Sequence, residues 1–94
     1  MAGPERKVED SFVTWCWREH KLLARKLRDL KRNGFPDRSI VLSGGRLVCI
    51  EFKSPVGELD VAQKLEIAAL RRDGVPVLVT SELKEAQQWL LEQM

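Results

Sequence analysis

The sequence predicts an α/β fold in which a central sheet is flanked by helices. Two apolar runs, residues 39–42 and 47–52, are separated by Ser43, Gly44 and Gly45, which is a strong signature of a β-hairpin. Nearly every position of both runs is apolar, whereas a strand with one solvated face would alternate polar and apolar residues. Amphipathic helical patterns lie before and after this hairpin. The hairpin is therefore expected at the centre of a sheet that helices cover on both faces.

The elements around the hairpin follow from local signals. A first helix is predicted from Pro4, because apolar residues recur there at spacings of three and four and proline is tolerated in a first turn. A second helix is expected to have Asp60 as its N-cap and to run to about Arg72. The run "VPVLVT" predicts a strand, and its Pro76 places that strand at an edge of the sheet. A last helix is expected after Ser81 as N-cap.

The segment from Lys21 to Arg32 is compatible with two structures. Leu23, Leu27 and Leu30 continue a helical spacing, and periodicity alone favours a helix. The run "KLLARKL" is also short enough to form a strand after a break in the chain. Gly34 ends whichever element is present, because glycine adopts the left-handed backbone that other residues resist.

Composition indicates one soluble globular domain, residues 1–94. Hydrophobic residues make up 44% and charged residues 32% of the 94 positions, which argues against disorder and against burial in a membrane. The first ten residues contain no apolar segment that could act as a secretion signal, so a reducing cytoplasm is expected. Cys16 and Cys49 are accordingly expected to be free thiols.

Positive charge is concentrated in one part of the chain. The net charge of +2 is too small to indicate nucleic-acid binding by itself. Half of the sixteen Lys and Arg residues, however, lie between Arg18 and Arg38, where only three acidic residues occur. This cluster is either a surface for a polyanion or an ordinary solvated face, and composition favours neither.

Two carboxylates and a lysine border the predicted hairpin. Side chains two apart in a strand share a face, so Glu51 and Lys53 point the same way. The position of Asp37 depends on the turn. With a two-residue turn Asp37 pairs opposite Phe52 and faces away from Glu51. With a three-residue turn, or a bulge near Ser39, Asp37 pairs opposite Glu51 and the carboxylates share a face.

A shared face would favour a metal ion. Two carboxylates that close repel each other unless a cation lies between them. Mg²⁺ prefers oxygen ligands and keeps several waters, so two carboxylates and a backbone carbonyl make a plausible open site for phosphodiester hydrolysis. The alternative is purely structural. Asp37 then caps a turn after Pro36, and Glu51 and Lys53 are a strand end emerging into water.

The string "GFPDRSIVLSGGRLVCIEFKSPVGELDVAQ" resembles the VRR-NUC branch of the PD-(D/E)XK nuclease superfamily. The resemblance covers Gly34 to Gln63, about a third of the chain. It implies a restriction-endonuclease-like αβββαβ core with a central mixed sheet of four strands flanked by helices, and an extra C-terminal helix. It also implies that "KLLARKL" is the first strand, against the periodicity, and that residues 1–94 form a single VRR-NUC-type nuclease domain.

The resemblance also implies roles for individual residues. Implied ligands of Mg²⁺ or Mn²⁺ are Asp37, Glu51, the backbone carbonyl of Phe52 and, from the first helix, Glu9. The implied catalytic residues are Asp37, Glu51, Lys53 as the catalytic lysine, and Gln63 as a group that positions substrate or water. The basic cluster would contact the DNA backbone. The expected DNA-binding residues are Lys26, Arg38, Arg25, Arg28, Lys31, Arg32 and Ser54.

Stand-alone proteins that this chain resembles are phage or bacterial enzymes of the host cytoplasm. The implied function is therefore that of a metal-dependent, structure-specific DNA endonuclease. It would cut branched DNA, above all four-way (Holliday) junctions and also flaps, as a homodimer whose two-fold symmetry matches the junction. Two alternatives have the same fold: a branched-DNA binding module without turnover, and a nuclease subunit of a larger repair complex.

Overall fold

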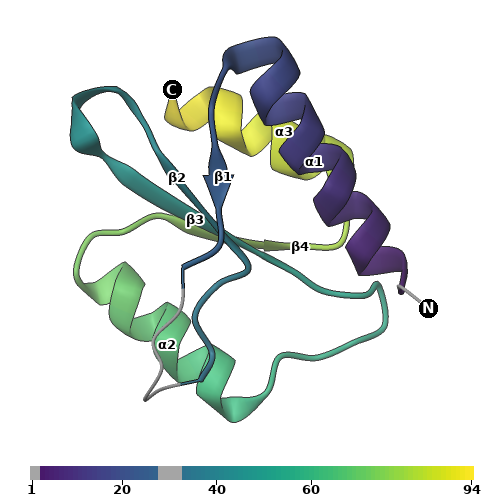
Figure 1. Cartoon of the computed structure of the whole chain (residues 1–94). Helices are drawn as coiled ribbons and strands as arrows, with labels where there is room; N and C mark the ends of the chain where they lie inside the picture. The colour runs from purple at the N-terminus through teal and green to yellow at the C-terminus, as the bar shows by residue number, and fades with distance from the viewer. Residues whose placement is uncertain (1–2, 28–32) are drawn as a thin grey trace.

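The computed structural model describes residues 3–27 and 33–94 (Figure 1). Within these ranges the chain forms three α-helices and a four-stranded mixed sheet. The elements in chain order are α1 (Pro4–His20), β1 (Ala24–Arg25), β2 (Arg38–Val41), the 3-10 turn η1 (Ser43–Gly45), β3 (Leu47–Phe52), α2 (Val61–Arg72), β4 (Val77–Thr80) and α3 (Leu83–Gln93). No helix in the described ranges is long and apolar enough to cross a membrane.

The sheet has the strand order β1-β2-β3-β4. Strands β1, β2 and β3 pair antiparallel, whereas β3 and β4 pair parallel, with α2 as the connection between them. The hairpin is thus the central pair and β4 is an edge strand, as the apolar runs and Pro76 predicted. Helices α1 and α3 cover one face of the sheet and α2 covers the other (Figure 1).

The two faces of β3 are buried against different helices. Ile50 belongs to the larger core cluster, together with Phe12 of α1 and other residues of α1 and α3. Cys49 belongs to a smaller cluster with Ile67 of α2 and Val77 of β4. Successive strand residues point to opposite faces, so a strand buried on both faces must be apolar at nearly every position. Glu51 is the polar exception, and by alternation it shares the α2 face with Cys49.

Helix α2 begins and ends as its sequence predicts. Asp60 is the N-cap, and its side chain accepts a hydrogen bond from the backbone N–H of Gln63 at 2.8 Å. The Gln63 side chain accepts in return from the backbone N–H of Asp60 at 2.9 Å, which completes a capping box. After the helix, Gly74 adopts a left-handed backbone with φ of 89°.

The start of α3 corrects a prediction. Its N-cap is Glu82 and not Ser81, and the Glu82 side chain makes no capping hydrogen bond. The backbone N–H of Glu82 donates instead to the hydroxyl of Thr80 at 3.0 Å. A buried threonine at the end of β4 therefore holds the backbone of the N-cap residue, and no side chain caps the first turn of α3 from Glu82.

The segment after α1 forms a strand, so the helical interpretation of its leucines was wrong. Helix α1 ends at His20, and the left-handed backbone of the C-cap residue Lys21 (φ 54°) turns the chain out of the helix. Ala24 then pairs with Ile40 of β2. Leu23 and Leu27 are exposed, so the helical spacing that includes them does not mark a core face. Residues 28–32 lie outside the described ranges.

Candidate metal centre at the end of the central hairpin

The hairpin turn has three residues, Ser43–Gly45. The backbone N–H of Leu42 donates to the carbonyl of Arg46 at 2.8 Å and closes the turn. Gly44 and Gly45 have φ of 82° and 77°, a left-handed conformation that other residues rarely adopt. Of the two turns that the glycines permit, the structure therefore contains the longer one.

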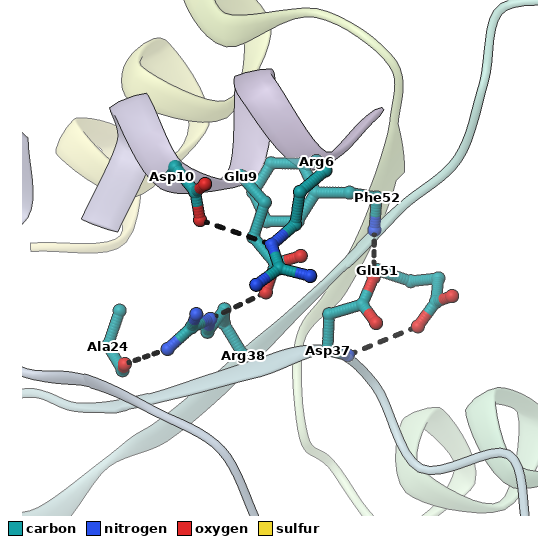
Figure 2. Close-up of polar contacts among 8 residues, drawn as sticks. All are labelled: Arg6, Glu9, Asp10, Ala24, Asp37, Arg38, Glu51 and Phe52. Atoms are coloured by element: carbon teal, nitrogen blue, oxygen red, sulfur yellow. Dashed lines mark hydrogen bonds and ion pairs between the residues drawn. The ribbon is translucent and has the colours of Figure 1, made fainter. Parts of the chain in front are cut away.

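This turn sets the register that brings the acids together. Arg38 pairs with Ile50 and the remaining pairs follow in step, so the same register places Asp37 opposite Glu51. The backbone N–H of Asp37 donates to Glu51 Oε1 at 3.1 Å. The backbone N–H of Phe52 donates to Asp37 Oδ2 at 2.8 Å (Figure 2). Each carboxylate is thus anchored by backbone of the segment that carries the other acid.

Burial and neighbouring negative charges raise the pKa of both acids, with Asp37 acting on Glu51 and Glu9 acting on Asp37. Glu51 is buried, with 3% of the residue exposed. Burial, followed by the negative charge of Asp37, raises the pKa of Glu51 to about 8. Burial also raises the pKa of Asp37, although the hydrogen bond from Phe52 partly opposes the rise. A cation shared by the two carboxylates would remove this repulsion.

Gln63 reaches the carboxylates from the first turn of α2. Its Nε2 donates to Glu51 Oε2 at 2.8 Å, while its Oε1 accepts the Asp60 N–H. The second oxygen of Glu51 therefore has a donor from the helix and the first has a donor from Asp37. Gln63 lies beside the acids, where the family resemblance placed it. Asp60, which holds Gln63, is a residue of the site that sequence reasoning treated only as a helix cap.

Glu9 approaches from α1, on the other face of the sheet from α2, and is paired with a cation. Arg38 Nε donates to Glu9 Oε2 at 2.7 Å, and the two side chains are 14% and 10% exposed. Arg38 Nη1 also donates to the backbone carbonyl of Ala24 at 3.0 Å (Figure 2). The expected DNA-binding residue Arg38 thus links α1, β1 and β2. Spacing in the sequence gives no sign of this pairing between residues that are 29 positions apart.

The Lys53 ammonium is directed toward the loop that follows β3. Its Nζ donates to the backbone carbonyls of Ser54 at 3.2 Å and Gly57 at 3.4 Å. Among the described residues, no hydrogen bond joins Nζ to Asp37 or Glu51. Strand alternation predicted that Lys53 shares the face of Glu51, but alternation fixes the start of a side chain and not the position of its tip.

The expected DNA-binding residues are distributed around β1 and the loop after β3. Arg25 and Lys26 are exposed, and Ser54 is half-buried. Burial raises the pKa of Asp37, and the positive charge of Lys26 is among the effects that oppose this rise, so Lys26 is close enough to act on the acid. The remaining three, Arg28, Lys31 and Arg32, lie outside the described residues.

The donor set matches a hard divalent cation. In residues 3–27 and 33–94, no three His, Cys, Asp or Glu side chains are arranged to hold an ion together. The candidate set is therefore smaller, with carboxylates at Asp37 and Glu51 and a backbone carbonyl at Phe52. Such oxygen donors suit Mg²⁺ or Mn²⁺, because these ions retain several waters. Glu9 is engaged in an ion pair with Arg38, and its negative charge helps to raise the pKa of both Asp37 and Glu51.

Four features together define the class of PD-(D/E)XK nuclease folds. They are a first helix, an antiparallel hairpin with an acid on each strand segment, an E-x-K sequence, and a helix that leads to a parallel strand. Within that class the chain is similar to a solved structure described as a VRR_NUC domain. The TM-score is 0.79 and the sequence identity 26%, over 95% of this chain and 96% of that chain. The chain therefore has the fold of a VRR_NUC domain. No protein-family model and no curated protein matches the sequence.

Proposed function

We propose that this chain is a Mg²⁺- or Mn²⁺-dependent endonuclease that hydrolyses phosphodiesters in branched DNA. One observation carries the proposal, namely that the hairpin register sets Asp37 beside Glu51 in a VRR_NUC fold. A buried acid beside a half-buried one, both with raised pKa values and with no ion pair to either among residues 3–27 and 33–94, is a costly arrangement for a fold that needs only stability. Such arrangements are typical of functional sites.

Each residue of the site has an assigned task. A bound divalent ion would polarise the phosphodiester and lower the pKa of a bound water. Asp37, Glu51 and the Phe52 carbonyl would hold the ion, and Gln63 would keep Glu51 in position. Lys53 would leave the carbonyls of the following loop and neutralise negative charge that develops on the phosphate.

The four-way junction is the proposed substrate, and two copies of the chain would act on it together. A two-fold dimer presents two sites to a nearly two-fold junction. Lys26, whose positive charge acts on Asp37, and its chain neighbour Arg25 are exposed basic residues suited to phosphate contacts, which carry no sequence information. Preference among DNA structures would then come from their shape and bendability.

Cleavage of a labelled four-way junction tests the proposal. Purified wild-type protein with Mn²⁺ is expected to nick the junction, whereas Asp37→Asn and Lys53→Ala are expected to bind it in a gel shift without nicking. Asp73→Asn is the matched control, because Asp73 is an exposed acid at the far end of α2. Nicking by Asp37→Asn and Lys53→Ala at the wild-type rate contradicts the assignment of the site.

The direction of Lys53 favours one alternative, a branched-DNA binding module without turnover. In this reading the ammonium stabilises the loop after β3 through Ser54 and Gly57 and has no other task. Such a module shifts the junction band but never nicks it, at any Mg²⁺ or Mn²⁺ concentration. Sedimentation of the pure protein separates independent action from a role as a subunit of a larger complex, since a stable dimer supports the former and a monomer the latter.

A further inference from the structure

We propose that Asp60 is a positioning residue for Glu51 and acts through Gln63; the inference rests on the proposed metal site. The capping box of α2 and the carboxylate share one side chain. Gln63 Oε1 accepts a hydrogen bond from the backbone N–H of Asp60 at 2.9 Å, and Gln63 Nε2 donates to Glu51 Oε2 at 2.8 Å. Its own backbone N–H is held by Asp60 Oδ1 at 2.8 Å.

The orientation of the Gln63 amide is fixed by its two neighbours. Oε1 faces a donor, the backbone N–H of Asp60, and Nε2 faces an acceptor, the Glu51 carboxylate. A flipped amide would place its NH₂ against the backbone N–H of Asp60, so that two donors would face each other, and this contact is repulsive whether or not Glu51 carries a proton. The backbone N–H of Asp60 therefore determines which atom of Gln63 faces Glu51, while the Asp60 side chain holds the backbone N–H of Gln63 and so fixes the helix turn from which the amide extends.

Glu51 is held by one donor on each oxygen. Asp37 N–H binds Oε1 at 3.1 Å and Gln63 Nε2 binds Oε2 at 2.8 Å. A carboxylate with a donor on each oxygen cannot rotate about its terminal bond without breaking both hydrogen bonds. If the Gln63 bond is lost, only the longer bond from Asp37 remains to orient the group.

The first turn of α2 also contacts the segment that leads to Asp37. A Cβ atom at Gly34 would lie 2.4 Å from the carbonyl oxygen of Ala62 and 2.7 Å from the backbone nitrogen of Gln63. Gly34 has a φ of 96°, so glycine is favoured here by both space and backbone conformation. The helix turn that Asp60 caps thus lies against the backbone that leads to Asp37 and reaches Glu51 through the Gln63 side chain.

Removal of the Asp60 side chain is expected to loosen this turn and thereby Glu51. Residues that hold a metal ligand in place typically change metal affinity by about 10- to 100-fold when they are replaced. Asp60→Ala should therefore weaken Mn²⁺ binding at least about 10-fold. Asp60→Asn should restore it, because asparagine caps a helix as well as aspartate.

Gly74→Ala is the matched control. It strains the other end of the same helix, where φ is 89° and an added Cβ meets no atom within 4 Å, and it does not contact the acids. Both Asp60→Ala and Gly74→Ala are expected to lower the unfolding temperature, but only Asp60→Ala is expected to weaken Mn²⁺ binding. A merely structural role of Asp60 predicts that the two variants bind Mn²⁺ equally.

The test uses the full chain and Mn²⁺ alone, with binding measured by calorimetry or electron paramagnetic resonance. The inference is supported if Asp60→Ala loses affinity while Asp60→Asn and Gly74→Ala keep it. It is overturned if Asp60→Ala binds as Gly74→Ala does, or if Asp60→Asn fails to restore binding.

A second readout separates this inference from the proposed function. The side-chain NH₂ signals of Gln63 are followed by NMR without metal, where they should be slowed in exchange in wild type and Asp60→Asn and lose this protection in Asp60→Ala. If the wild type neither binds Mn²⁺ nor cuts DNA, the proposed function fails, and the amide signals decide the positioning role. Unchanged Gln63 signals in Asp60→Ala overturn it.

Discussion

Glu51 is the residue at which the requirements of the fold and of the site conflict most. Its carboxylate is buried beside Asp37, and burial raises its pKa from 4.5 to about 8. The folded chain therefore keeps the Glu51 proton between these pH values, while the unfolded chain releases it. The raised pKa of Glu51 stabilises the folded state fully below pH about 4.5, and this stabilisation is lost as pH rises toward 8.

Unfolding measured over a series of pH values tests how the Glu51 proton affects the stability of the chain. In metal-free buffer with a chelator, the free energy of unfolding of the wild type should fall between pH 5 and 8 by on the order of a few kcal/mol. Glu51→Gln has no proton to lose and should show a smaller decline. Parallel curves for the two proteins would mean that Glu51 does not titrate in this range.

The pair of Arg38 and Glu9 gives a second prediction about individual residues. Removal of one partner of a buried pair leaves an uncompensated charge, so Arg38→Ala should destabilise the chain by about 3 kcal/mol. On α1, the helix that carries Glu9, Arg6 pairs with Asp10 at 3.5 Å, with the two side chains 56% and 61% exposed. Arg6→Ala should therefore cost less than about 1 kcal/mol. Denaturant unfolding of both variants compares them, and equal losses would contradict a structural role for Arg38.

Among the elements, the central hairpin and the first turn of α2 position the site. The three-residue turn of the hairpin sets the register that places Asp37 opposite Glu51. The cap of α2 places Gln63 against Glu51. A change in either element should alter the geometry of the acids without a substitution at the acids themselves.

Two glycine variants separate crowding from backbone strain. Gly44→Ala meets no neighbouring atom and suffers only from its positive φ, at a cost of about 1 kcal/mol. Gly34→Ala has the same backbone problem and also collides with the backbone of Ala62 and Gln63, so about 3 kcal/mol is expected. Denaturant midpoints measure the difference. Similar midpoints would indicate that the loop before Asp37 does not lie against α2.

The sequence predicted those elements whose signals are local. The hairpin, the edge strand and the two ends of α2 each follow from turn glycines, proline or a capping residue. Periodicity failed at Leu23 and Leu27, because pairing of Ala24 with Ile40, distant in the sequence, decided the structure there. The resemblance to VRR-NUC proteins supplied this strand.

The site was predicted less completely than the fold. The acids and the position of Gln63 were anticipated, but the side-chain partners were not. Gly44 and Gly45 permit turns of two lengths, so the sequence left the face of Asp37 open. The partner of Arg38 and the direction of the Lys53 ammonium depend on tertiary contacts that no local pattern encodes.

For the whole molecule, the sheet brings groups from both of its faces to one end of the hairpin. Helix α1 contributes Glu9, which is paired with Arg38 (Figure 2). Helix α2, on the opposite face of the sheet (Figure 1), contributes Gln63. The net charge of +2 is small, so attraction to DNA would depend on where the basic residues lie.

Salt dependence of junction binding tests that distribution. Each lost phosphate contact should reduce the slope of log K against log salt concentration by about 1. Lys26→Ala is expected to do so, because Lys26 is exposed near Asp37. Arg38→Ala is expected to leave the slope unchanged, since its guanidinium is committed to Glu9 and Ala24. A reduced slope for Arg38→Ala with an unchanged slope for Lys26→Ala would mean that Arg38, and not Lys26, contacts the DNA phosphates.

The most direct test is a crystal soaked with Mn²⁺ and measured for anomalous scattering. A peak is expected between Asp37 and Glu51, at about 2 Å from a carboxylate oxygen of each, with waters completing the shell. A soaked crystal with no peak there, and with both acids in the same hydrogen bonds as in the metal-free chain, would mean that Asp37 and Glu51 do not hold a metal ion.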